Sequence, residues 1–278
     1  MKTLLAIAAT VFAIYVLVVV FYALKQRSLI YYPTTLPLDL AREQAQALDG
    51  SPWRGAGGEW WGWTKAIAAG TNGRPRRAVV FHGNAGMALN RGYYADLLAG
   101  FHESGPWRVH VFEYPGYGPR GGEPGEAAFA AAALKAVDAL IEQRPEPLLI
   151  IGESIGSGVA AGIARRRPEA VAALLLITPF DSLVDVAHHH MPYLPTGLVL
   201  KDRYDNVDAL KAFARPLVVV TAGQDTIIPP ERAVPLLEQH PGPVLHVVQS
   251  EAGHNTLHFD PDRSPWPAID RFIDSSLR

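Results

Sequence analysis

From residue 78 onward, short apolar runs alternate with longer stretches of helical composition. The apolar runs cover residues 78–81, 109–112, 148–151, 171–177, 217–221 and 244–248, and helices are predicted near 90–101, 126–143, 156–166 and 266–275. Strands that alternate with helices imply a mostly parallel sheet with helices on both faces. The chain is therefore predicted to be an α/β protein, and in such sheets the reacting groups gather beyond the carboxyl ends of the strands.

The composition is that of a folded globular protein. Of the 278 residues, 49% are hydrophobic and 19% are charged, which is ordinary for a globular chain. The length fits one α/β domain with a short appendage. The 25 basic and 27 acidic residues leave a net charge of -2, which gives no indication of a nucleic-acid partner. There is no cysteine, so a thiol nucleophile, disulfides and cysteine-based zinc sites are excluded.

An uncharged, almost wholly apolar stretch covers residues 4–24. Lys2 precedes it, and Lys25 and Arg27 follow it. A helix that crosses a bilayer needs about 20 apolar residues, whereas a secretory signal has an apolar core of roughly 7 to 15 and a small-residue cleavage site. No good cleavage site follows here, so residues 1–27 are predicted to be a retained single-pass membrane anchor. A cleaved signal and a buried domain helix are the alternatives, and the flanking charges do not decide the orientation.

The chain between this stretch and the first alternating strand is less regular. Residues 28–58 are predicted to be a connecting segment with a short helix near 41–48. Residues 59–64 contain three tryptophans and favour an early strand, because aromatic residues are enriched in strands. We expect those tryptophans to pack in the core. Residues 59–278 are accordingly predicted to form the folded domain.

One apolar strand runs directly into a glycine-flanked serine. Residues 148–151 are followed by Gly152-Glu153-Ser154-Ile155-Gly156 and then by a helix of small residues. This is the nucleophile-elbow pattern, in which a strained turn lifts the serine hydroxyl clear of the sheet. At the start of a helix, backbone amides and the positive dipole end face developing negative charge. Ser154 is therefore predicted to be a nucleophile, and a plain tight turn is the alternative.

A serine hydroxyl is a weak nucleophile at neutral pH, so it needs a base, and the base needs an acid that orients it. In folds with this elbow the chain order is serine, acid, histidine. Asp225 follows the strand at 217–221 and is the predicted acid, and His254 follows the strand at 244–248 and is the predicted base. Asp181, after an earlier strand, is the rival acid.

No other histidine is predicted to take part in catalysis or to bind a metal ion. Three consecutive histidines at 188–190 invite a metal interpretation, but their side chains do not converge easily on one ion. They are predicted to face solvent or line a pocket, and no metal site is predicted. His258 follows His254 by four residues and is predicted to have a surface or supporting role. His82 is predicted to be structural and to pack beneath the loop that it begins.

Acyl transfer also needs two donors for the oxyanion of the tetrahedral intermediate. The amide of Ile155, directly after the serine, is the first predicted donor. The amide of Asn84 is the second predicted donor, and the amide of Ala85 is the alternative. Gly83 and Gly86 allow this loop to turn tightly and expose its backbone.

Five motifs together resemble those of the α/β-hydrolase superfamily. They are His82-Gly83-Asn84-Ala85-Gly86, Glu113-Tyr114-Pro115-Gly116-Tyr117-Gly118, the serine elbow, Gly223-Gln224-Asp225-Thr226-Ile227-Ile228-Pro229 and Gly253-His254-Asn255. The anchor followed by Gln26-Arg27-Ser28-Leu29-Ile30-Tyr31-Tyr32-Pro33 is similar to the beginning of the membrane-anchored abhydrolase-domain serine hydrolases, a serine aminopeptidase S33-like group. The resemblance covers nearly the whole chain.

The resemblance implies an eight-stranded, mostly parallel sheet, no cofactor, and hydrolysis of esters, thioesters or amides through an acyl-enzyme. Some eukaryotic relatives remove palmitoyl groups from proteins. The segment at about 181–213 is too short for a large helical cap, so a small lid is expected. Tyr193, Leu194, Leu198 and Leu200 in this segment are predicted to line an apolar acyl pocket.

The sequence therefore predicts a membrane-held serine hydrolase that acts on a small-molecule or acylated substrate. An acyltransferase would use the same residues and differ only in whether another alcohol or thiol outcompetes water. A membrane-tethered binding module is the non-enzymatic alternative, and it predicts a broken triad. The sequence leaves the acyl substrate and the oligomeric state open.

Overall fold

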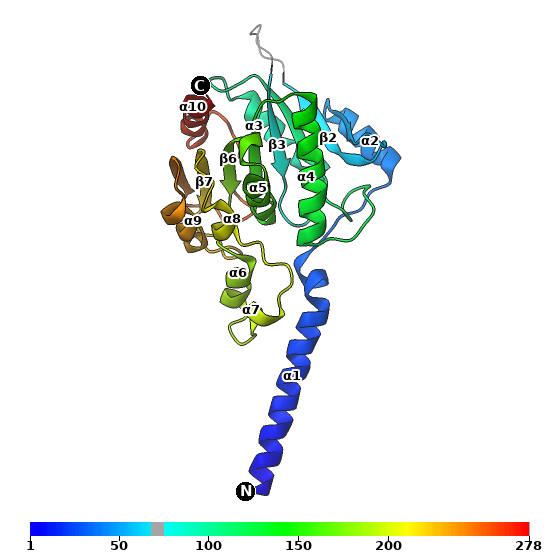
Figure 1. Cartoon of the computed structure of the whole chain (residues 1–278), viewed down its shortest axis with the longest axis vertical. Helices are drawn as coiled ribbons and strands as arrows, with labels where there is room; N and C mark the ends of the chain where they lie inside the picture. Colours follow the sequence, from blue (N-terminus) through cyan, green and yellow to red (C-terminus); the bar gives the residue numbers. More distant parts are fainter. Residues whose placement is uncertain (68–74, 278) are drawn as a thin grey trace.

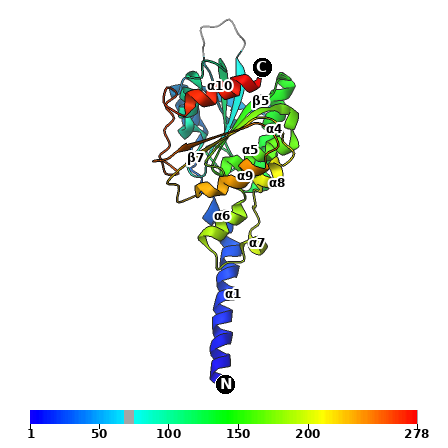
Figure 2. The same cartoon turned by 90° about the vertical axis from the view of Figure 1, so that its left-hand side faces the viewer.

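An eight-stranded sheet in the order β1-β2-β4-β3-β5-β6-β7-β8 forms the centre of the molecule (Figures 1 and 2). The structure is a computed structural model that describes residues 1–67 and 75–277. The strands are β1 (Ser51–Arg54), β2 (Trp60–Ala66), β3 (Arg76–Phe81), β4 (Trp107–Phe112), β5 (Leu148–Glu153), β6 (Val171–Ile177), β7 (Leu217–Ala222) and β8 (Val244–Gln249). Strand β2 is antiparallel to β1 and β4, and all other neighbours are parallel. The predicted mostly parallel, eight-stranded sheet is confirmed.

Helices cover both faces of the sheet. One face packs against α4 (Glu126–Gln143), α5 (Ile155–Arg166), α8 (Asn206–Leu210) and α9 (Val234–Gln239), and the other against α2 (Leu38–Ala47), α3 (Tyr93–Ala99) and α10 (Trp266–Leu277). Successive strand residues point to opposite faces, so in β3 Val79 belongs to the first core cluster and Val80 to the second. Burying both faces explains why the central strands are almost continuously apolar.

The segment between β6 and β7 forms a small lid, as expected. It contains α6 (Leu183–His190), α7 (Thr196–Val199) and α8. Helices α6 and α7 lie below the sheet in Figure 1, beside the amino-terminal helix.

Helix α1 (Lys2–Ile30) projects away from the rest of the molecule (Figures 1 and 2). Among the described residues it is the one helix long and apolar enough to cross a membrane, and none of its most apolar 18-residue window is buried. The interpretation of this stretch as a buried domain helix is therefore wrong. Helix α1 is a candidate membrane anchor.

The last turn of α1 is fixed to the folded domain by polar groups that meet at the buried carboxylate of Asp202. The Arg27 guanidinium donates two hydrogen bonds to the Asp202 carboxylate, at 3.1 and 3.3 Å. The Tyr31 hydroxyl donates to the same carboxylate at 3.1 Å and lies 3.0 Å from the Tyr204 hydroxyl. Burial raises the pKa of the Tyr31 phenol well above its ordinary value, so the phenol keeps its proton and remains a donor.

Three local predictions were wrong or incomplete. Strand β1 lies in the segment 28–58 that was predicted to be an irregular connection; it has four residues, includes Pro52 and stands at the sheet edge, where proline is tolerated. The predicted helix at 90–101 is instead a 3₁₀ turn (Ala88–Arg91) followed by α3, with Gly92 between them. Helix α9 was missed because six residues carry too little periodicity to predict a helix.

The tryptophans predicted to pack in the core do so. Trp60, Trp61 and Trp63 in β2 are all buried. The indole of Trp63 donates a hydrogen bond to the carbonyl oxygen of Ala88 at 2.9 Å. Strand β2 is thereby tied to the loop that follows β3.

Candidate active site

Ser154 lies in a strained turn between β5 and α5. Its φ and ψ angles are 53° and -120°, a conformation that costs a residue with a side chain on the order of 1 to 3 kcal/mol. The flanking glycines are required because the backbone is crowded there. A Cβ atom on Gly152 would lie 2.7 Å from the carbonyl oxygen of Gly156, and a Cβ on Gly156 would lie 2.1 Å from that of Phe81. The turn therefore has the geometry of a nucleophile elbow.

The three residues predicted from chain order form one hydrogen-bonded chain. The Ser154 Oγ atom lies 3.0 Å from His254 Nε2, and His254 Nδ1 lies 2.7 Å from Asp225 Oδ2. The other carboxylate oxygen of Asp225 accepts hydrogen bonds from the amides of Ile227 and Ile228 at 2.9 and 2.8 Å. The side chains of Asp225 and His254 are 1% and 11% exposed, so water is largely excluded from this chain.

The rival residues lie elsewhere. The Asp181 carboxylate accepts from the Arg232 guanidinium at 3.0 Å and from the Ser182 amide at 2.8 Å. His258 uses its backbone to bind the Gln249 side chain, at 3.1 and 3.0 Å. Neither group joins the chain that contains Ser154.

His82 is buried beneath the loop that follows β3, where it was predicted to pack. Its Nδ1 atom lies 2.8 Å from the carbonyl oxygen of Gly83, and its Nε2 atom lies 3.2 Å from Glu113 Oε1. The other oxygen of Glu113 accepts from the Ala88 amide at 3.0 Å. These contacts fix both ends of the loop and join it to Glu113, which follows β4.

The loop carries the two amides considered as oxyanion donors. The amide of Ala85 donates to the side-chain oxygen of Asn84 at 2.9 Å and is therefore already engaged. Asn84 and Ala85 both border the same cavity as Ser154 and Ile155, so the engaged amide of Ala85 is what distinguishes them. The amide of Ile155 is at the first position of α5, where a helix has no internal partner for it. This arrangement favours Asn84 over Ala85.

The Asn84 side chain has a role that the sequence did not reveal. Its oxygen accepts from the Tyr32 amide at 3.1 Å and from the Tyr117 hydroxyl at 2.9 Å, and its nitrogen donates to the carbonyl oxygen of Ile30. Asn84 thus ties the loop beside Ser154 to the end of α1. No motif or spacing links these positions.

A second unpredicted cluster surrounds Glu153. The Oε2 atom of this carboxylate accepts from Arg91 Nε at 3.1 Å and from the hydroxyls of Tyr93 and Tyr94 at 2.9 and 3.1 Å. Burial alone raises the pKa of Glu153, but the Arg91 charge and the Tyr93 hydrogen bond outweigh it and hold the pKa below its ordinary value. Arg91 and Tyr93 are 62 and 60 residues from Glu153 in the chain, so spacing did not indicate the cluster.

His254 lies between two cavities of different character. One has a volume of about 410 Å³ and is lined by Ser154, the loop after β3 and apolar residues of α1 and α6. The other has a volume of about 600 Å³, and its lining includes Arg91, Tyr93 and Glu153. A substrate bound at Ser154 therefore has a more apolar side and a more polar side.

The consecutive histidines form the last turn of α6. The Nε2 atom of His190 lies 2.8 Å from the carbonyl oxygen of Ile227. Within residues 1–67 and 75–277, no group of three or more histidine, aspartate or glutamate side chains is placed to hold a metal ion.

Comparisons with known proteins agree with this architecture. The chain is 34% identical over 260 residues to the uncharacterized protein Rv2307c of Mycobacterium tuberculosis, which spans 92% of this chain and 90% of the relative. It is 31% identical over 169 residues to the lysophosphatidylserine lipase ABHD12 of Danio rerio, over 54% of this chain and 44% of that protein. Further relatives are named α/β-hydrolase domain-containing proteins. No family model matches the chain.

A solved structure shares the fold. The Pyrococcus furiosus esterase Pf2001 superimposes with a TM-score of 0.61 at 15% identity, over 89% of this chain and 97% of the esterase. The eight-stranded sheet, the elbow and the relatives define an α/β hydrolase. This chain belongs to the α/β-hydrolase superfamily and is related to its lipases and esterases.

Proposed function

We propose that this protein is a serine hydrolase that cleaves carboxylic esters, thioesters or amides. Ser154 is the nucleophile, His254 is the general base, and Asp225 orients the imidazole. The amides of Ile155 and Asn84 stabilise the oxyanion. The observation that carries the proposal is the continuous hydrogen-bonded chain from Asp225 through His254 to a serine held in a strained elbow.

In the first half of the reaction, the Ser154 oxygen bonds to the substrate carbonyl carbon while His254 Nε2 takes the hydroxyl proton. The carbonyl electron pair moves to oxygen, where the two amides stabilise the negative charge. The pair then returns, the bond to the leaving group breaks, and His254 gives its proton to the departing atom. The cavity beside Arg91 and Glu153 receives that leaving group.

In the second half, water attacks the acyl-enzyme and His254 accepts its proton. The ester bond to Ser154 breaks, the serine oxygen regains a proton, and a carboxylic acid departs. An acyltransferase would replace this water by an alcohol or thiol, and both cavities beside His254 are large enough to admit water.

We also propose that the protein works at a membrane on a lipid or other acylated substrate. Residues 1–27 serve as a retained single-pass anchor, and residues 59–278 form the catalytic domain with its lid at about 181–213. The connecting segment, 28–58, contributes β1 to the sheet. Support comes from the apolar helix α1 and from relatives named lipase and esterase.

A fluorophosphonate probe tests the nucleophile, because it forms a covalent bond with an activated serine. We expect the wild-type protein to be labelled and Ser154→Ala to remain unlabelled. Ser250→Ala is the matched control, since Ser250 is an exposed serine in the turn after β8, and it should label like wild type. An unlabelled wild type, or a labelled Ser154→Ala, would show that the assignment is wrong.

A further inference from the structure

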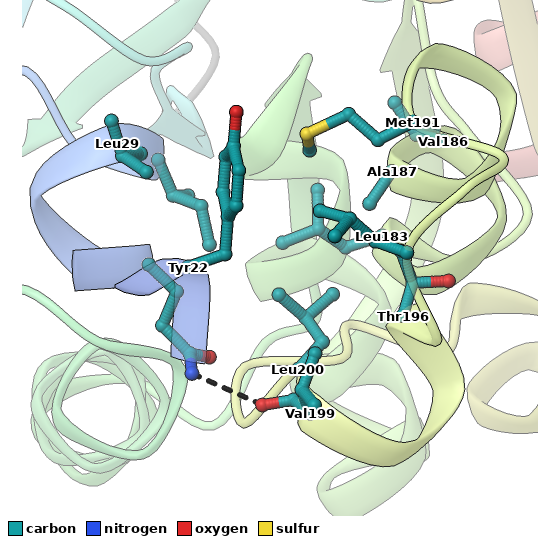
Figure 3. A pocket seen from close by; sticks show the side chains of 12 residues that line it. Tyr22, Leu29, Leu183, Val186, Ala187, Met191, Thr196, Val199 and Leu200 are labelled. Atoms are coloured by element: carbon teal, nitrogen blue, oxygen red, sulfur yellow. Dashed lines mark hydrogen bonds between the residues drawn. The ribbon is translucent and has the colours of Figure 1, made fainter. Parts of the chain in front are cut away.

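An apolar cavity lies between the candidate anchor and the lid. It has a volume of about 320 Å³. Figure 3 shows Tyr22 and Leu29 of α1 on one side and Leu183, Ala187 and Met191 of the lid on the other, with side chains directed toward the space between them. The cavity therefore has one wall from the amino-terminal helix and one from a segment more than half the chain away.

This cavity adjoins the one that contains Ser154. Four residues line both: Leu29 and Ile30 from the end of α1, and Leu183 and Val186 from α6. An acyl chain whose carbonyl carbon lies at Ser154 can thus continue past these residues into the space beside α1. All four shared residues are aliphatic, so the boundary between the two cavities is apolar.

One of the polar side chains in the lining, that of Gln26, already has hydrogen-bond partners. The Gln26 side chain is buried; its nitrogen donates to the carbonyl oxygen of Val199 at 3.1 Å, and its oxygen accepts from the Lys201 amide at 2.7 Å (Figure 3). Gln26 therefore fastens α1 to the lid. The occupant that fits the remaining surface is hydrocarbon, because burying a polar group without a partner is costly.

The position of the cavity along α1 points to a source for that hydrocarbon. Tyr22 lines the cavity at the end of the uncharged stretch, just before Lys25, and tyrosine is enriched at the boundary between membrane and water. The lid reaches further down the helix, because the Tyr15 hydroxyl donates to the carbonyl oxygen of Tyr193 at 3.0 Å. In the short helix α7, which forms the tip of the lid, Leu198 is 88% exposed.

We propose that this cavity is the acyl-chain subsite and that the membrane anchor itself forms one of its walls. The subsite takes a single hydrocarbon chain of an ester or thioester lipid, at the level where the bilayer meets water. Helix α1 is then part of the substrate-binding site as well as a tether. The inference rests on the proposed serine hydrolase function.

The residues that line the subsite differ in part from the sequence prediction. Leu194 and Leu200 line it, as expected. Tyr193 and Leu198 are 56% and 88% exposed and lie outside it. The hydrogen bond from Tyr15 to Tyr193 shows that this part of the lid lies beside the apolar part of α1, and Figure 1 shows α7 next to that helix.

Chain-length selectivity tests the subsite. The full-length protein is reconstituted in phosphatidylcholine vesicles, and kcat/KM is measured for p-nitrophenyl acetate, octanoate and dodecanoate. We expect kcat/KM to rise with chain length until the cavity is full, by up to about fourfold for each methylene buried. The quantity compared between variants is the ratio of kcat/KM for dodecanoate to that for acetate.

Two variants test the two walls of the cavity, one from the lid and one from α1. Ala187→Trp fills the cavity from the lid, and Leu29→Trp fills it from α1; each should lower the dodecanoate-to-acetate ratio at least tenfold. The matched controls are Ala131→Trp, on an exposed face of α4, and Leu5→Trp, on an exposed part of α1 remote from the cavity. Both controls should keep the wild-type ratio. Fluorophosphonate labelling of Ser154 verifies that each variant is folded.

The outcomes separate the inference from the function on which it rests. If wild type neither labels nor hydrolyses the acetate ester, the serine hydrolase proposal is wrong. If wild type labels and cleaves acetate but the ratio is unaffected by Ala187→Trp, the cavity is not the acyl subsite. If Ala187→Trp lowers the ratio and Leu29→Trp does not, the subsite belongs to the lid alone and the claim about α1 is wrong.

Discussion

The region around Ser154, at the carboxyl ends of the central strands, and the lid that faces α1 differ in how tightly they are packed. In the elbow, a single added carbon at Gly156 would lie 2.1 Å from a backbone oxygen, whereas the same carbon at Gly197 in the lid would have no neighbour within 4 Å. Asp225 is almost wholly buried, while Leu198 is 88% exposed. The groups that make and break bonds lie in a densely packed region, and the surface of the lid beside α1 is open.

This difference follows from what each region has to do. Proton transfer requires heavy-atom distances near 3 Å, and close packing fixes them. Binding hydrocarbon requires only apolar surface, because the hydrophobic effect is non-directional. We therefore expect substitutions at the carboxyl ends of the strands to change acetate turnover or stability strongly, and substitutions in the lid to leave both nearly unchanged.

The largest effect is expected for the acid of the hydrogen-bonded chain. Asp225→Asn keeps the shape of the side chain but leaves His254 without its carboxylate partner, so turnover of p-nitrophenyl acetate should fall by about 10⁴. Asp181→Asn is the matched control, since Asp181 contacts Arg232 instead. A larger loss in Asp181→Asn than in Asp225→Asn would reverse the assignment of the acid.

The two glycines provide the most direct contrast in stability. Gly156→Ala forces the strands and the elbow apart, and we expect the free energy of unfolding to fall by about 3 kcal/mol. Gly197→Ala has free space and should leave stability unchanged or raise it by about 0.5 kcal/mol, because alanine restricts the unfolded chain. Urea denaturation of the purified proteins measures both. Equal losses would mean that the lid is packed as tightly as the elbow.

The contrast also explains which features the sequence predicted. Ser154, Asp225 and His254 each follow a strongly apolar strand, and the order of such strands determines which loops meet. The boundaries of α4 and β6 match the prediction, because 18 residues of helical periodicity and seven consecutive apolar residues are strong local signals.

The features that were missed depend on single contacts between distant segments. Asn84 binds the backbone of Ile30 and Tyr32, and Gln26 binds that of Val199. A side chain that bonds to a carbonyl or an amide places no constraint on the partner residue's type. Neither composition nor periodicity therefore indicates that α1 and the lid lie side by side.

An intermediate effect is expected where α1 meets the domain. Asp202→Asn removes the negative charge of the carboxylate that accepts hydrogen bonds from Arg27 and Tyr31. The free energy of unfolding should fall by about 1 to 2 kcal/mol, a value kept small because Arg27 is half exposed and its charge is screened by solvent. Asp208→Asn, whose partners Arg165 and Lys211 are on the surface, should cause no measurable change. Denaturation in detergent measures the difference, and equal stability of the two variants would mean that this contact does not hold α1.

The smallest effect on stability is expected at Leu198, in the short helix α7 at the tip of the lid. What is measured there is whether the side chain lies in water or in the membrane. Leu198→Cys introduces the only thiol in the chain, so an environment-sensitive dye can be attached there alone. In vesicles its emission should shift to the blue, because an exposed residue beside the apolar part of α1 enters the bilayer boundary. Ala131→Cys on α4 is the control and should keep the emission of a dye in water. Identical spectra at the two positions would place the lid tip in water, and lipid would then have to leave the bilayer before it reached the cavity beside α1.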